Sequence, residues 1–133
     1  MSDVAWNASC ETGHDRIDSE HRILLGLIQG LAREVDTGSP QSRVLRLVAE
    51  IQKYAEYHFL REENVMIDIG FPGIAAHRIA HLRLLNELYR YTDLLRAGTT
   101  PPSEVAAFLA NWFMAHTERE DQEITRYVAG HPR

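Results

Sequence analysis

Seven of the 133 residues are histidines, and histidine is the side chain that most often binds metal ions in proteins. Two pairs of candidate ligands are separated by four residues: His58 with Glu62, and His77 with His81. This spacing places both members of a pair on one face of an α-helix. Each pair could therefore bind the same ion, through imidazole nitrogens and carboxylate oxygens.

Five histidines follow the three-four spacing of the apolar residues around them, so the pattern directs them to the buried faces of their helices. One histidine in such a position is usually a core residue with a satisfied hydrogen bond. Five of them, with carboxylates and without partners, would cost on the order of several kcal/mol to bury. A metal ion removes this cost. The five histidines are His21, His58, His77, His81 and His116.

Distances along the chain place these histidines at one level. His21 lies 17 residues before the first predicted turn, near residue 38, and His58 lies 20 residues after it. At roughly 1.5 Å of rise per residue, the mismatch is about one helical turn or less. His81 and His116 lie 18 and 17 residues from the third predicted turn, near residue 99. We therefore expect the five side chains to converge near one end of a bundle.

Four segments with helical periodicity position these side chains. They cover residues 18–36, 40–66, 73–97 and 102–128, after an N-terminal arm at 1–17, and Gly-, Pro-, Ser- and Thr-rich breaks separate them. Asp18 or Ser19 is the expected N-cap of the first helix, and Ser39 that of the second, with Pro40 at its first helical position. Short connections make neighbouring helices antiparallel. The prediction is an all-α, up-down-up-down four-helix bundle that forms a single domain over 1–133.

Composition excludes several classes of protein. The net charge of −5 and the dispersed basic residues argue against a nucleic-acid partner. No stretch approaches the roughly 18 apolar residues of a membrane helix, and the N-terminus lacks the pattern of a secretory signal. The single cysteine, Cys10, excludes a disulfide framework and indicates a reducing compartment. We expect a cytoplasmic monomer in which Cys10 is a simple thiol.

The ligand count indicates the metal. Five imidazoles and one or two carboxylates are too many for one tetrahedral zinc ion, so two ions are expected. Nitrogen and oxygen ligands without thiolate suit iron or manganese, and dinuclear iron sites built from Glu and His occur in bundle cores. Iron is the favoured metal, with carboxylates bridging the two ions.

Several motifs resemble those of the hemerythrin family, in particular the bacterial hemerythrins. They are IDSEH at 17–21, HFLREENVM at 58–66, GFP at 70–72, HRIAH at 77–81 and HTERED at 116–121. The resemblance covers nearly the whole chain. It implies two iron ions with an oxo or hydroxo bridge, one bound by three histidines and one by two. Its implied ligands are His77, His81 and His116 for the first ion, His21 and His58 for the second, and Glu62 and Asp121 as bridges.

Asp121 is assigned from the resemblance alone. It follows His116 by five residues, a rotation of about 140° around an ideal helix, so geometry by itself favours Glu120. If the family pattern holds, the fourth helix is locally irregular there. A single-turn π-bulge of the kind often found at functional sites would supply that irregularity.

The resemblance also implies the function, which is reversible O2 binding at the iron that has only two histidines, for storage, delivery or sensing. The ligand charges agree, because fewer anionic ligands than in ferritin-like sites stabilise high-valent iron less. We therefore expect a protein that is not an enzyme. Alternatives are a di-iron enzyme acting on peroxide or nitric oxide, a sensor domain excised from a longer signalling protein, and iron handling without gas chemistry.

By the same resemblance an apolar O2 pocket is lined by Leu24, Phe59, Trp112, Phe113 and Thr117. Phe113 stands where the family more usually has leucine, and Thr117 where isoleucine is common. In one interpretation the ring fills the core and the threonine hydroxyl bonds to its own helix. In the other, Phe113 narrows access and Thr117 brings polarity near the iron, changing O2 affinity or oxidation.

Four further residues are expected outside the ligand set. Glu63 is predicted to be solvated or to support a ligand from outside, and Trp6 to pack. His14 and His131 are predicted to lie on the surface.

Overall fold

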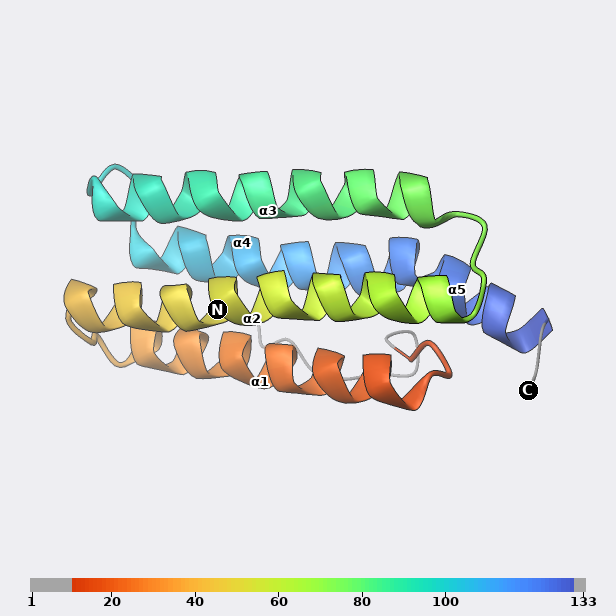
Figure 1. The fold of residues 1–133 in the computed structure, drawn as a ribbon. Helices are drawn as coiled ribbons and strands as arrows, with labels where there is room; N and C mark the ends of the chain where they lie inside the picture. The colour runs from red at the N-terminus through yellow and green to blue at the C-terminus, as the bar shows by residue number, and fades with distance from the viewer. Residues whose placement is uncertain (1–10, 131–133) are drawn as a thin grey trace.

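The computed structural model describes residues 11–130, except for the side chains of residues 119 and 120. Trp6, Cys10 and His131 lie outside the described residues, so the predictions for them are untested. The helical elements, coloured by residue number in Figure 1, are α1 (Asp15–Asp36), α2 (Gln41–Asp68), α3 (Ile74–Arg96), α4 (Pro102–Ala115), the π-helix η2 (His116–Glu120) and α5 (Asp121–Gly130).

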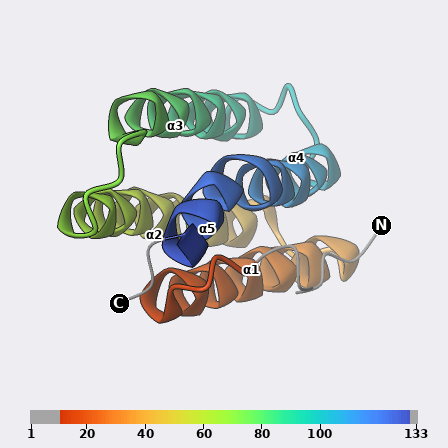
Figure 2. The ribbon, with the colours of Figure 1, turned by 90° about the vertical axis from the view of Figure 1, so that its right-hand side faces the viewer.

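The helices form an antiparallel bundle in which successive helices alternate in direction (Figure 1). α1 packs against α2 and α4, and α3 packs against the same two helices. The α4, η2 and α5 elements follow one another as the fourth member of the bundle, and Figure 2 views the bundle from the end where α5 lies. The prediction of an all-α, up-down-up-down bundle is confirmed. No helix in the described part of the chain is long and apolar enough to span a bilayer.

Two glycines end helices in the same way. Gly38 after α1 and Gly98 after α3 have φ values of 78° and 75°, a left-handed conformation that side chains other than glycine rarely adopt. The Ser39 amide donates to the Glu34 carbonyl, and the Thr99 amide to the Leu94 carbonyl. This six-to-one hydrogen bond is typical of a Schellman cap and reverses the chain within a few residues.

The predicted beginning of the first helix was wrong. α1 begins at Asp15, so neither Asp18 nor Ser19 is an N-cap and the N-terminal arm does not extend to residue 17. The buried carboxylate of Asp18 instead accepts hydrogen bonds from the Thr12 amide and hydroxyl, at 2.8 and 2.9 Å. Asp18 therefore anchors the segment that precedes the helix. Its acidic side chain resembles a cap in sequence but lies one turn inside the helix.

Other boundaries differ by one or two residues. Pro40, not Ser39, is the N-cap of α2, since its carbonyl accepts from the Arg43 and Val44 amides. The Ser39 hydroxyl donates to the Glu34 carboxylate at 2.8 Å. α2 extends to Asp68, α3 covers Ile74–Arg96 instead of 73–97, and the last helical turn ends at Gly130 rather than 128.

Two apolar cores fill the bundle. The larger includes Leu24, Phe59, Leu84 and Phe113, and the smaller, nearer the α5 end, consists of Ile17, Val65, Met66, Phe71 and Ile124. Along α1, His21 lies between Ile17 of the smaller core and Leu24 of the larger. The other helices repeat this order, so the candidate ligands form a polar layer between two apolar ones.

Candidate metal centre

Seven buried side chains meet in this polar layer, and each of the four helical members of the bundle contributes at least one. α1 contributes one histidine, α2 a histidine and a glutamate, α3 two histidines, η2 a histidine and α5 an aspartate. Their exposed fractions lie between 0 and 3%, which is unusual for so many titratable groups. The seven are the predicted ligands His21, His58, Glu62, His77, His81, His116 and Asp121.

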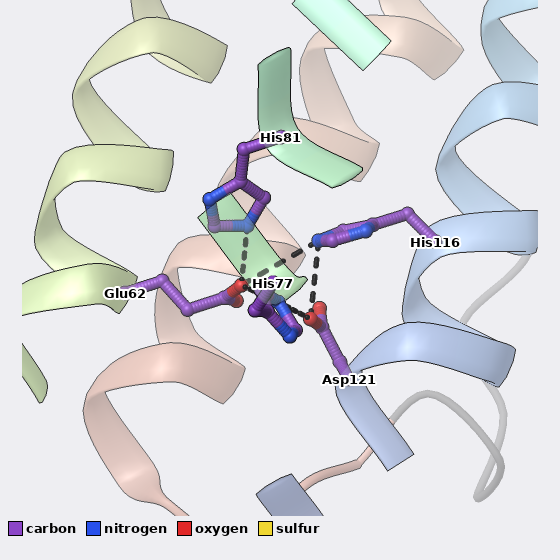
Figure 3. A group of neighbouring side chains, drawn as sticks. All are labelled: Glu62, His77, His81, His116 and Asp121. Carbon is purple, nitrogen blue, oxygen red and sulfur yellow. Dashed lines mark hydrogen bonds and ion pairs between the residues drawn. The ribbon is translucent and has the colours of Figure 1, made fainter. Parts of the chain in front are cut away.

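The first group of candidate ligands contains three histidines and both carboxylates (Figure 3). Glu62 Oε1 lies 2.8 Å from Nε2 of both His77 and His81, and 3.5 Å from Nε2 of His116. Asp121 Oδ1 lies 3.0 Å from His77 Nε2 and 3.1 Å from His116 Nε2. All five ligand atoms lie within 4.8 Å of one another, so one ion could contact them all after small shifts.

The second group contains two histidines and the same two carboxylates. His21 Nε2 lies 2.9 Å from Asp121 Oδ2 and 3.4 Å from Glu62 Oε2. His58 Nε2 lies 3.3 Å from Glu62 Oε2. Each carboxylate thus turns one oxygen to the three-histidine group and the other to the two-histidine group. This is the arrangement of a carboxylate that bridges two cations.

The π-helix explains how Asp121 reaches the layer. In a π-helix such as η2 the backbone hydrogen bonds join residues five apart instead of four. The wider turn brings His116 and Asp121 to the same side despite their spacing, with Nε2 and Oδ1 3.1 Å apart. The structure therefore contains the single-turn irregularity that the resemblance implied. The side chain of Glu120, which ideal helical geometry favoured, lies outside the described part.

The donor set fits a cation. His21 Nε2, His58 Nε2, Glu62 Oε2 and both Asp121 oxygens are buried atoms without a hydrogen bond. Some lie at ion-pair distance from one another but without the alignment of a hydrogen bond. Buried polar atoms are rarely left in this state. Nitrogen and oxygen lone pairs that converge without partners are what metal coordination satisfies.

Without a metal, the two carboxylates of this cluster favour the protonated form of two histidines. Burial opposes the charged imidazolium, but Asp121 and Glu62 outweigh it and raise the pKa of His21 and of His77 to about 9. Burial also opposes the two carboxylates, and the surrounding histidines still hold the pKa of Glu62 and of Asp121 well below the usual range. Protons therefore take the place that a cation would occupy.

Two carboxylates outside the ligand set contact candidate ligand histidines at Nδ1, the ring nitrogen that does not converge on the polar layer. Glu20 Oε1 lies 2.9 Å from His58 Nδ1, and Glu63 Oε2 lies 2.8 Å from His81 Nδ1. Glu63 thus supports a ligand, one of its two predicted roles. Sequence reasoning missed Glu20. The available signal was its place beside His21 in the IDSEH motif, one residue out of the ligand register.

The predicted pocket residues are all buried, but they contact different parts of the bundle. Phe113 packs edge-on against His21, with ring centroids 6.0 Å apart. Phe59 stacks on His81 at 4.1 Å and 7°. The Trp112 indole donates to the Leu84 carbonyl at 3.0 Å.

Two further predicted pocket residues, Leu24 and Thr117, are buried, and His14 is half-buried. Leu24 lies in the larger core. The Thr117 hydroxyl donates to the Phe113 carbonyl at 2.9 Å, as the first interpretation of this residue expected. His14, predicted on the surface, is half-buried and is the N-cap of α1.

Comparisons with known proteins find related sequences and a similar fold. The chain is similar to a bacteriohemerythrin of Stenotrophomonas maltophilia, 27% identical over 98% of this chain and 85% of that protein. A bacteriohemerythrin of Clostridium acetobutylicum is 24% identical over 89% of this chain and 95% of its own. The solved structure of a wild-type hemerythrin has a TM-score of 0.79 and 22% identity, covering 89% of this chain and 92% of that one.

The family described as the hemerythrin HHE cation binding domain matches residues 12–128. This range includes all seven side chains of the polar layer. The chain therefore belongs to the hemerythrin family.

Proposed function

We propose that this protein binds two iron ions in the polar layer and binds O2 reversibly there, for storage, delivery or sensing. The three-histidine group would hold one ion and the two-histidine group the other, with Glu62 and Asp121 contributing an oxygen to each. The proposal is supported by the family, whose described activity is cation binding, and by relatives named bacteriohemerythrin.

The unequal number of histidines in the two groups carries the proposal. The first group offers three imidazoles and two carboxylate oxygens, and one oxygen from solvent would complete six ligands for an ion held there. The second group offers one imidazole fewer, which leaves a place for a small molecule. Two ferrous ions held in these groups would together supply two electrons for O2 binding, one from each ion.

The surroundings of the two-histidine group suit an uncharged gas. His21 and His58 are at most 1% exposed, and the ring of Phe113 lies against His21. Leu24, one turn further along α1, is also buried. These side chains exclude water and ions from the second group, whereas O2 has no charge to desolvate.

A spectroscopic cycle tests the function. The iron-loaded protein is reduced without oxygen, exposed to air and then purged with inert gas while its visible spectrum is recorded. We expect a charge-transfer band that appears with air and bleaches on purging. Metal-free and zinc-loaded protein, which lack redox-active iron, serve as controls and should show no band.

Three other results would contradict reversible O2 binding or identify another function. If air produces only the oxidised iron spectrum, and purging does not reverse it, reversible binding is wrong. Steady consumption of peroxide or nitric oxide by the iron-loaded protein would then identify an enzyme. Iron released at equilibrium to a weak chelator would instead indicate metal handling.

A further inference from the structure

In two candidate ligands, the imidazole nitrogen Nδ1 is hydrogen-bonded to a glutamate on a neighbouring helix. His58 on α2 contacts Glu20 on α1, and His81 on α3 contacts Glu63 on α2. A carboxylate can only accept in such a bond, so the imidazole Nδ1–H donates. Neither glutamate belongs to the two groups that converge on the polar layer.

Each of these carboxylates is held in place by an arginine. Arg61 Nε donates to Glu20 Oε2 at 2.9 Å, and Arg78 Nε donates to Glu63 Oε1 at 3.3 Å. One oxygen therefore bonds an imidazole and the other a guanidinium in both cases. Glu20 is only 8% exposed, so the Arg61 guanidinium compensates its charge where water has little access.

The two carboxylates are divided between the two ligand groups. His58 belongs to the two-histidine group and His81 to the three-histidine group. The other histidine of the smaller group differs, because Nδ1 of His21 is buried and has no hydrogen bond. Within the smaller group, only one imidazole is therefore bonded to an outer carboxylate.

An acceptor behind an imidazole has two chemical effects. It fixes the ring proton on Nδ1, so that Nε2 keeps its lone pair for a cation, and it prevents the ring from rotating. A charged acceptor also makes Nε2 a stronger electron donor, which favours the higher oxidation state of a bound metal. Of the two, only the second effect requires the negative charge.

We propose that Glu20 and Glu63 are positioning residues, one for each half of the metal centre, which orient His58 and His81 and strengthen them as donors. The inference rests on the proposed metal site. It adds that the two halves can be altered separately from outside the ligand set.

The test uses full-length variants Glu20→Gln and Glu63→Gln. Metal-free protein is titrated with ferrous iron under anaerobic conditions and followed by calorimetry. In each variant we expect one of the two ions to bind roughly 10–100-fold more weakly and the other to bind as in the wild type. Thermal unfolding of the metal-free variants shows whether they fold.

Glu56→Gln is the matched control. Glu56 also lies on α2, and the Tyr89 hydroxyl on α3 donates to it at 2.6 Å, but the residue contacts no histidine in the described bonds. It should bind both ions like the wild type. If Glu20→Gln fails to fold, Glu63→Gln alone carries the test, because the Glu63 side chain is 20% exposed and tolerates change more readily.

A second measurement separates charge from shape. A glutamine amide oxygen can still accept the Nδ1–H bond, so a purely structural role predicts an unchanged reduction potential. Our proposal predicts a higher potential in both glutamine variants. Wild-type affinity and potential in both variants would overturn it, and so would an equal loss in Glu56→Gln. A wild type that binds no iron would overturn the proposed function instead.

Discussion

The Thr117 hydroxyl is turned toward its own helix. It donates to the Phe113 carbonyl at 2.9 Å, one turn earlier, where the backbone enters the π-helix. A hydroxyl bonded in this way offers little polarity to the two-histidine group. We therefore expect Thr117→Ile to leave the oxidation rate of the reduced, iron-loaded protein in air unchanged, as measured by its visible spectrum.

Thr117→Val is the control for that experiment, because valine has nearly the shape of threonine without its hydroxyl. Slower oxidation in both variants would show that the hydroxyl acts on the iron. Slower oxidation in Thr117→Ile alone would assign the effect to the added methylene group.

Phe113 combines burial with contact to a candidate ligand. Its side chain is 1% exposed and lies against His21. Truncation leaves a cavity beside the polar layer, so Phe113→Ala should lower the free energy of unfolding by about 3–5 kcal/mol. Urea unfolding measures the loss. Phe108→Ala, at a half-buried ring stacked on Tyr91, should lose clearly less; equal losses would contradict the packing argument.

The π-helix η2 contains one residue more than a regular α-helix would need to place His116 and Asp121 on the same face. Deleting the exposed Glu118 brings His116 and Asp121 to a spacing of four, which a regular α-helix places on one face. We expect this variant to retain two bound ions per chain, measured by metal analysis after gel filtration.

Inserting an alanine after Glu118 has the opposite consequence. The added residue turns Asp121 about 100° beyond the position that the π-helix gives it, so we expect loss of bound metal. Retention of both ions by the insertion variant would show that Asp121 is not a ligand. Loss in the deletion variant would show that the π-helix itself is needed.

Helical periodicity predicted the elements and the level of the five histidines because both depend on regular geometry. Features that depart from that geometry were not predictable in this way. The place of Asp121 came from resemblance, since no spacing rule anticipates a π-helix. The early start of α1 was missed because Asp18 bonds Thr12 across a loop. Glu20 was missed because its burial depends on contact with another helix.

For the whole molecule, the two apolar cores enclose a layer that either protons or metal ions can neutralise. In the metal-free protein the pKa of His21 and of His77 is raised from 6.5 to about 9. Groups with a raised pKa stabilise the fold fully below the unfolded value and lose that contribution as the pH rises through the folded value. The metal-free protein should therefore lose stability, on the order of a few kcal/mol, between pH 6.5 and 9.

Metal binding requires the same imidazoles to be neutral, so its dependence on pH has the opposite sign. A bound iron ion would displace the protons of His21 and His77, and its affinity should rise across the same interval. Urea unfolding of metal-free and loaded protein at pH 6.5 and 9 measures both trends, and calorimetry in two buffers counts the protons released. A gap between the two stabilities that narrows toward pH 9 would contradict a shared site for protons and metal.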